Sequence, residues 1–217
     1  MTGDTKFCHL FKMLKKKNFN GIIESDETFF LQSEKGSKSM KRSGRKRGGK
    51  SSTRGISGDQ VAVIVTADRS GSMDLTVATM GRIEKKDIAN AIGNRITKES
   101  ILCADGHVSY KGFAKDNNLS LVVLRADLKQ HVKHGIYHIQ NVNSLHYRIK
   151  KWIDSTFWGV STKYLQNYLN WYRIQEAYKK SICAKQDMAN GSTEDIFSLN
   201  RYRLINNRYQ TLITTQI

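Results

Sequence analysis

The pattern of apolar and polar positions predicts strands in the first third of the chain. Three runs rich in β-branched and aromatic residues are each bounded by turn-forming residues, a pattern typical of strands. They cover residues 21–32, 60–71 and 73–81. A long, strongly basic stretch separates the first run from the second.

Helical and strand-like patterns alternate after these runs. Ile88, Ile92 and Ile96 recur at every fourth position, which predicts a helix over residues 85–96. The next three runs predict, in turn, a strand, a short helix and a strand: residues 101–105, 110–118 and 119–125. This order of elements predicts an α/β fold with a mixed sheet flanked by helices.

Two further helices are predicted in the last part of this region. The first covers HIQNVNSLHYRIKKWI, residues 138–153, with one apolar face formed by Val142, Leu145, Ile149 and Trp152. The second presents an aromatic-rich face formed by Tyr164, Leu165, Tyr168, Leu169 and Trp171. On the first helix, Asn143 and Lys150 lie about 20° apart, since each residue advances the helix by about 100°. They therefore share one shoulder of the helix, beside its apolar face.

The charge narrows the class of partner. The chain has 217 residues, 39% of them hydrophobic, which is enough for one sizeable core. Its net charge of +17 and pI near 9.9 indicate a polyanionic partner, such as nucleic acid or an acidic membrane surface. With no bilayer-length apolar run and no signal peptide, we expect a cytoplasmic protein. The three cysteines, Cys8, Cys103 and Cys183, suggest neither a disulfide framework nor a cysteine zinc site.

Much of the positive charge lies in one segment, residues 35–58. It contains nine Lys or Arg, no acid and six of the sixteen glycines, which predicts a flexible basic loop between the first two strands. The loop is either a solvated linker or an arm that lies along phosphates. The second interpretation predicts these DNA-binding residues: Lys38, Lys41, Arg42, Arg45, Lys46, Arg47, Lys50 and Arg54.

Two aspartates are candidates for metal chemistry. Asp26 falls in the middle of the first strand, and Asp105 falls at the carboxyl end of the strand ILCAD. Their carboxylates converge if the two strands are neighbours, and Mg²⁺ is commonly held by one or two carboxylates plus substrate phosphates. Each aspartate also has an ordinary interpretation, Asp26 as a pairing residue at a sheet edge and Asp105 as a turn residue before Gly106. By geometry alone, Asn143 and Lys150 are simply exposed polar residues.

Three histidines suggest a weaker alternative. His131, His134 and His138 have helix-like spacing, as in some zinc sites, but too few ligands accompany them. Trp152, Trp158 and Trp171 are most simply core residues, although an exposed tryptophan can stack on an unpaired base.

Several segments together carry a family resemblance. These are GIIESDETFF, RSGRKRGGK, ADGHVSYKGFA, HIQNVNSLHYRIKKW and FWGVSTKYLQNYLNWYR, which lie in order between about residues 21 and 175. The chain resembles the ISXO-type insertion-sequence transposases, a group of the DDE superfamily with a ribonuclease H-like core. In many of its members asparagine replaces the final glutamate, and a lysine follows seven positions later.

The resemblance implies a set of site residues and an activity. Asp26 and Asp105 match the catalytic aspartates, Asn143 the third ligand position, and Lys150 the downstream lysine. The implied activity is cleavage and strand transfer of double-stranded DNA, at element ends and target, with two Mg²⁺ or Mn²⁺ ions and a homo-oligomer assembled on DNA. Lys150 and its neighbour Lys151 would also contact that DNA, and the protein would be associated with the nucleoid and not with a membrane.

The resemblance also implies a domain organisation. Residues 1–20 would be a remnant of an N-terminal DNA-binding region, residues 21–175 the catalytic domain, and residues 176–217 a C-terminal helical tail. Family members usually carry a zinc-binding and helix-turn-helix region before the core. The alternative is therefore a truncated, catalytically inactive remnant that only binds DNA.

Overall fold

The computed structural model describes residues 18–38, 49, 51 and 53–188. The chain divides into two compact units. Residues 15–170 form one unit, which holds the sheet and most of the helices. Of the other unit, the structure describes residues 171–188, which are helical.

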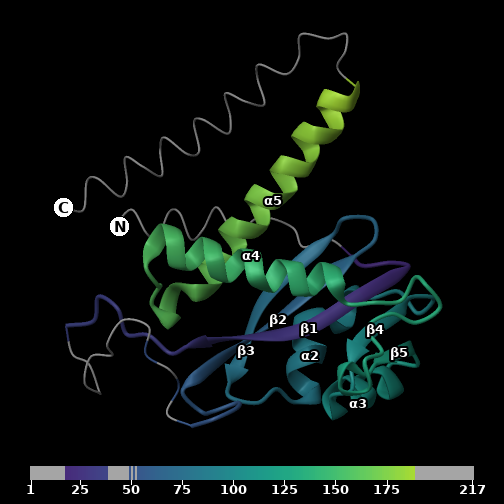
Figure 1. The fold of residues 1–217 in the computed structure, drawn as a ribbon, viewed down its shortest axis with the longest axis horizontal. Coiled ribbons are helices and arrows are strands. Elements are labelled where there is room, and N and C mark those ends of the chain that lie inside the picture. Colours follow the sequence, from purple (N-terminus) through teal and green to yellow (C-terminus); the bar gives the residue numbers. More distant parts are fainter. Residues whose placement is uncertain (1–17, 39–48, 50, 52, 189–217) are drawn as a thin grey trace. The chain divides into compact units, whose positions relative to one another are not determined.

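Five strands form a single mixed sheet (Figure 1). They are β1 (Ile22–Leu31), β2 (Gln60–Asp68), β3 (Met73–Met80), β4 (Ile101–Asp105) and β5 (Ser120–Leu124). Their order is β3-β2-β1-β4-β5; β2 is antiparallel to β1 and β3, while β1, β4 and β5 run parallel. The predicted mixed sheet is confirmed, and this strand order is that of a ribonuclease H-like fold.

Four α-helices accompany the sheet in the described part of the chain. They are α2 (Lys85–Ile92), α3 (Val108–Asp116), α4 (Gln140–Phe157) and α5 (Leu165–Met188). Short 3₁₀ turns are η1 (Gly93–Arg95), η2 (Ala126–Leu128) and η3 (Thr162–Tyr164). No helix in the described residues is long and apolar enough to cross a membrane.

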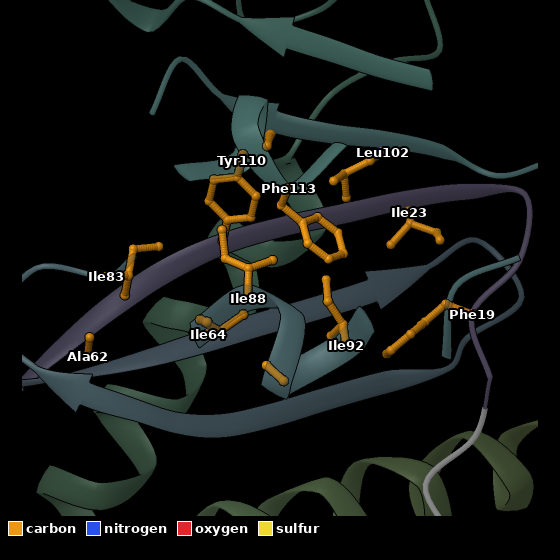
Figure 2. Close-up of a cluster of buried hydrophobic side chains, with 12 residues drawn as sticks. Phe19, Ile23, Ala62, Ile64, Ile83, Ile88, Ile92, Leu102, Tyr110 and Phe113 are labelled. Atoms are coloured by element: carbon orange, nitrogen blue, oxygen red, sulfur yellow. The ribbon is translucent and has the colours of Figure 1, made fainter. Parts of the chain in front are cut away.

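The two faces of the sheet are covered by different helices, because side chains alternate along each strand. Ile23 of β1 points into a core cluster with residues of α2 and α3 (Figure 2). Ser25, on the same face of β1, shares a hydrogen bond with Tyr110 of α3. Glu24 and Asp26, on the opposite face of β1, approach α4. Fully buried side chains such as Phe19, Ile88 and Phe113 make the α2 and α3 side the main core.

The helix predicted over residues 85–96 ends earlier than expected. α2 stops at Ile92, and Gly93–Arg95 form a 3₁₀ turn. Ile96 instead forms a parallel bridge with Phe19. A contact between distant parts of the chain therefore overrides the helical spacing of Ile96.

The helix predicted over residues 138–153 is shifted toward its carboxyl end, since α4 spans Gln140–Phe157. Val142, Leu145 and Ile149 are buried as predicted, but the fourth buried position is Ile153, and Trp152 is only partly buried. Trp158 is 67% exposed, so its assignment to the core was wrong.

The segment before α4 is not helical, which removes the basis of the zinc hypothesis. Lys133 and Tyr137 form an isolated antiparallel bridge around a turn, and His134 has a positive φ of 50°. His131 and His134 are exposed, while His138 accepts a hydrogen bond from Gln140 N, 3.3 Å away, at the start of α4. Helix-like spacing in the sequence was therefore misleading here.

The basic segment connects β1 to β2, as predicted from the sequence. Its start is attached to the turn between α4 and α5: Ser33 N donates to Thr162 Oγ1, and Thr162 N donates to Ser33 O. Lys35 Nζ donates to Phe157 O at 2.7 Å and to Gly159 O at 3.0 Å. Within this connection, residues 39–48, 50 and 52 lie outside the described part of the chain.

Candidate active site

The sheet topology places Asp26 and Asp105 on neighbouring strands. β1 and β4 are parallel and pair Glu24 with Cys103; two residues further along each strand stand Asp26 and Asp105. Both point to the α4 face of the sheet, because Ala104, which precedes Asp105, points to the core on the other side. In the sheet, β2 and β3 lie on one side of β1, and β4 and β5 lie on the other side. The carboxyl ends of parallel strands at such a switch point form the usual binding crevice of α/β sheets.

The acidic side chains at this edge are crowded. Burial, followed by the charges of Glu27 and Asp105, raises the pKa of Asp26 to about 8. Burial and the charge of Asp105 raise the pKa of Glu27 to about 7. Asp105 is oriented by the turn that follows β4, since its Oδ1 accepts a hydrogen bond from His107 N at 2.9 Å. Asp26 and Asp105 therefore share one poorly solvated face of the sheet, and Glu27, whose side chain points to the other face of β1, adds its charge from behind; the three charges repel one another.

Helix α4 brings a polar stripe to the same region. His146 Nδ1 lies 3.9 Å from Asp26 Oδ2. Burial and the nearby charge of Lys150 lower the pKa of His146 to about 4, so the imidazole is neutral at pH 7 and adds no positive charge beside Asp26. Asn143 and Lys150 lie about one turn before and after His146 on the same side of α4.

The structure places the two outer members of this stripe at the surface. Asn143 and Lys150 are exposed, and in the described part of the chain the Asn143 amide makes no hydrogen bond to either aspartate. Partial burial lowers the pKa of Lys150. The structure thus brings Asp26 and Asp105 together and sets Asn143 and Lys150 on the neighbouring helix, on either side of the residue that contacts Asp26.

The carboxylate oxygens of Asp26 and Asp105 are of the donor type that hard divalent cations prefer. His146 Nε2, on the helix that faces Asp26, is a buried atom without a hydrogen-bond partner. Carboxylates that repel each other become favourable ligands once a cation stands between them. Among the described residues, no three His, Cys, Asp or Glu side chains are grouped so as to hold a metal. A cation here would thus also depend on Asn143 or on oxygen atoms of a substrate.

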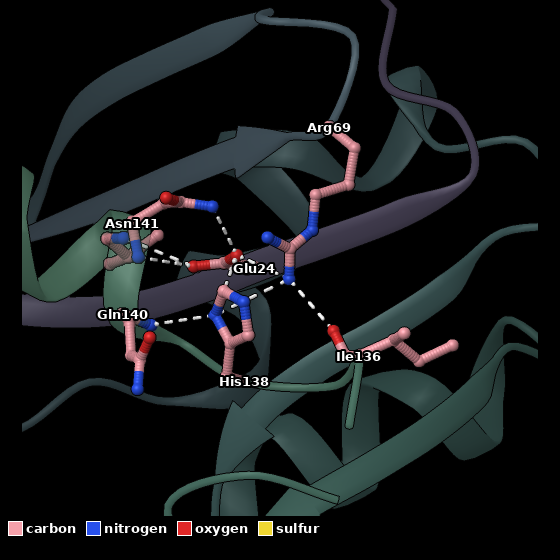
Figure 3. Close-up of polar contacts among 7 residues, drawn as sticks. Glu24, Arg69, Ile136, His138, Gln140 and Asn141 are labelled. Atoms are coloured by element: carbon pink, nitrogen blue, oxygen red, sulfur yellow. Dashed lines mark hydrogen bonds and ion pairs between the residues drawn. The ribbon is translucent and has the colours of Figure 1, made fainter. Parts of the chain in front are cut away.

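Sequence reasoning missed three residues of this region. Glu27 appeared only within the quoted segment GIIESDETFF, although it is a largely buried carboxylate next to Asp26 along β1. Glu24 belongs to the same quoted segment and was assigned no role, yet it binds the start of α4 (Figure 3). His146 carried a usable signal, because it lies three residues after Asn143 and four before Lys150, a spacing that places all three on one helical stripe.

The predicted DNA-binding residues divide into two groups. Lys38, Arg54, Lys150 and Lys151 are described and exposed. Lys41, Arg42, Arg45, Lys46, Arg47 and Lys50 lie outside the described residues.

Comparisons with known proteins give one family and distant structural neighbours. No curated protein matches the chain. Three solved structures of the Mos1 transposase are similar to it at low identity. The pre-cleavage transpososome is 14% identical, with 79% of this chain and 57% of that chain covered and a TM-score of 0.30. The strand transfer complex is 15% identical, with 86% of this chain and 61% of that chain covered and a TM-score of 0.30. The paired-end complex with the left transposon end is 13% identical, with 80% of this chain and 59% of that chain covered and a TM-score of 0.29. The chain therefore matches about three fifths of the length of these relatives.

The family comparison covers most of the chain. The model of the ISXO2-like transposase domain matches residues 18–174, which include the whole sheet, α2 to α4 and every candidate site residue from Asp26 to Lys150. This protein therefore belongs to the family of ISXO2-like transposase domains.

Proposed function

We propose that this protein is a transposase that cleaves and joins DNA strands by metal-dependent phosphoryl transfer. The reaction would take place at the carboxyl end of β4, where that strand lies beside β1. The observation that carries the proposal is the meeting of Asp26 and Asp105 in one buried region of a transposase-family domain. Double-stranded DNA at the ends of a mobile element, and at its target, would be the substrate.

The residues that would hold the metal are Asp26, Asp105 and Asn143. Two Mg²⁺ or Mn²⁺ ions bound there would lower the pKa of an attacking water or DNA hydroxyl and neutralise charge on the phosphate. Two carboxylates and one amide oxygen leave room for the substrate's phosphate oxygens, as is usual for Mg²⁺.

The chain's own residues would orient the DNA. Lys150, exposed on α4 about one turn from His146, would bind a phosphate as a point charge. His146 would keep Asp26 directed toward α4 without adding charge, since burial and Lys150 hold its pKa near 4. An asparagine at position 143 makes the site one charge less negative than a glutamate would, so DNA phosphates should contribute more to metal affinity.

The charge distribution supports DNA as the partner. A net charge of +17 attracts a polyanion, and the basic segment joins β1, the strand that carries Asp26, to β2. This basic segment would lie along the phosphates near the cleaved strand.

The test is cleavage of DNA that carries the sequences flanking this protein's own reading frame. Purified protein is incubated with that DNA and Mg²⁺ or Mn²⁺, and strand breaks are measured for the wild type, Asp26→Asn and Asp105→Asn. We expect cleavage only with metal, and a reduction of at least about 100-fold in each variant, because each removes a charged ligand.

Asp116→Asn is the matched control. Asp116 is an exposed aspartate on α3 that pairs with Lys85 at 2.6 Å, so its loss should leave cleavage unchanged. Metal-independent cleavage, or equal cleavage by all three variants, would refute the proposed function. Salt-sensitive DNA binding without any cleavage would favour a protein that only binds DNA.

A further inference from the structure

The start of α4 is held by a carboxylate from the sheet (Figure 3). Glu24 of β1 is 1% exposed. Its Oε2 accepts hydrogen bonds from the backbone N–H groups of Asn141 at 2.9 Å and Val142 at 3.2 Å. Its Oε1 accepts a third bond from Asn141 Nδ2 at 2.7 Å. Three bonds thus connect one strand residue to the first turn of one helix.

The helix needs an acceptor at this position. The first N–H groups of an α-helix have no partner within the helix and are usually capped by a side chain of the preceding residue. The preceding residue here is Ile139, whose side chain cannot accept a hydrogen bond. Glu24 supplies the missing acceptor from a residue more than a hundred positions earlier, and its negative charge also suits the positive end of the helix dipole.

Neighbouring groups fix the carboxylate in place. Arg69 Nη2 lies 2.9 Å from Glu24 Oε1 and also donates to Ile136 O at 3.1 Å. His138 Nδ1, 3.4 Å from the same Arg69 nitrogen, accepts the bond from Gln140 N. The turn that leads into α4 is therefore attached to the same carboxylate and arginine as the helix itself.

These contacts of Glu24 with Arg69 and the first turn of α4, called the Glu24 clamp below, lie close in sequence to the candidate site residues. Glu24 lies two residues before Asp26 on the same face of β1, and Asn141 lies two residues before Asn143 on α4. The strand and the helix that carry the proposed site residues are thus joined two residues before Asp26 and two residues before Asn143. A hydrogen-bonded, buried connection of this kind allows little sliding of α4 along the sheet.

We infer that Glu24 is a positioning residue for the transposase reaction: by binding the first turn of α4, it sets where Asn143, His146 and Lys150 stand relative to Asp26. This inference rests on the proposed function. Catalytic groups misplaced by about 1 Å can lower rates by about 100-fold, so a clamp so near the metal ligands should affect metal binding and rate.

The experiment compares Glu24→Ala, Glu24→Gln and Asn141→Ala with the matched control Asp74→Asn. Asp74 is an equally buried carboxylate of the same sheet, paired with Arg95 of η1 at 2.5 Å. Hydrogen exchange is measured for the amides of Asn141 and Val142 and, as a reference for folding, for β2. Mn²⁺ affinity is measured on the protein alone, and cleavage rate is measured as a function of Mg²⁺ concentration.

In Glu24→Ala we expect exchange at Asn141 and Val142 to become at least about tenfold faster while β2 stays protected. The half-saturating metal concentration should rise about tenfold, and the maximal cleavage rate should fall about 10- to 100-fold. Glu24→Gln keeps one acceptor oxygen and should lie between Glu24→Ala and the wild type. Asp74→Asn should change stability without changing the half-saturating metal concentration by more than about threefold.

The results separate the clamp from the function. Unchanged exchange at Asn141 and Val142, or faster exchange with metal affinity equal to that of Asp74→Asn, would overturn the inference. If Glu24→Ala does not fold, Glu24→Gln and Asn141→Ala decide by the same criteria. If the wild type does not cleave DNA, the proposed function fails, whereas exchange and Mn²⁺ affinity still decide whether Glu24 positions α4.

Discussion

Two acidic residues next to each other on β1 make the metal-free site electrostatically unfavourable. Asp26 and Glu27 are both largely withdrawn from water, and both feel the charge of Asp105. A buried carboxylate binds its proton more tightly than the same group does in the unfolded chain, because burial disfavours the charged form. Folding of the metal-free protein should thus be opposed by ionisation of these groups.

This effect predicts how stability depends on pH. The pKa of Asp26 is about 8 in the folded protein against 3.8 normally, so the native state holds the proton longer than the unfolded state. Asp26 therefore does not lower the free energy of unfolding below about pH 4. As the pH rises from 4 toward 8, this residue lowers the free energy of unfolding by up to a few kcal/mol. Urea unfolding of metal-free protein between pH 5 and 9 measures the slope. Asp26→Asn should flatten it; an equally steep slope in that variant would contradict the assignment.

If position 143 is a ligand position, as proposed, the residue there should change the charge of the site. Asn143→Glu adds a carboxylate to the stripe that contains His146, so we expect the half-saturating Mg²⁺ concentration to fall by about tenfold. Ser144→Glu adds the same charge one residue away, about 100° around α4, and serves as the control. Isothermal titration with Mg²⁺ or Mn²⁺ compares the two; similar affinities in both variants would argue against Asn143 as a ligand.

The sequence predicted some site residues and not others for a physical reason. Asp26 and Asp105 could be placed because a strand pattern fixes which residues share a face and which end a strand. The role of Glu24 could not, since its partners lie on α4 and its function depends on how the helix crosses the sheet. The site residues carried by α4 were proposed from the family resemblance rather than from spacing.

At the scale of elements, α4 is attached at its start by Glu24 and along its length by an apolar face. Val142, Leu145, Ile149 and Ile153 are buried. The buried face and the polar stripe formed by Asn143, His146 and Lys150 belong to the same helix. A change in how α4 packs should therefore also move the side chains of that stripe.

Ile149→Ala tests that packing. Ile149 is fully buried, and truncation of such a side chain costs about 2–4 kcal/mol, including the cavity left behind. Tyr147→Ala removes a larger side chain that is 67% exposed and should cost less than about 1 kcal/mol. Chemical denaturation measures both. Equal losses would mean that α4 does not pack through its predicted face.

Element boundaries show where local patterns stop being informative. The strands were predicted well because β-branched runs and turn residues coincide at their ends. The end of α2 was missed because Ile96 pairs with Phe19 instead of continuing the helix. On α4, Trp152 and Ile153 are adjacent and both fit a helical repeat from Ile149, so periodicity alone could not choose the buried one.

For the whole molecule, an excess of positive charge should govern DNA affinity. Changing Arg45, Lys46 and Arg47 to Gln removes three charges from the basic segment. If each contacts a phosphate, affinity falls and the slope of log affinity against log salt decreases by up to about 3. Fluorescence anisotropy at several salt concentrations measures this slope.

The control removes equal charge elsewhere. Lys85 and Lys86 of α2 and Lys115 of α3 are exposed on elements that cover the face of the sheet opposite to α4. Changing these three to Gln should leave the slope nearly unchanged. A similar decrease in both triple variants would mean that charge acts without a defined path for the DNA.

Mn²⁺ binding to the protein, measured by electron paramagnetic resonance, tests the proposed metal site most directly, for the wild type, Asp26→Asn, Asp105→Asn and Asp116→Asn. We expect the wild type and Asp116→Asn to bind Mn²⁺ alike, whereas each of the other two variants should lose at least about tenfold in affinity. Equal Mn²⁺ affinity in all four proteins would contradict a metal site built on Asp26 and Asp105.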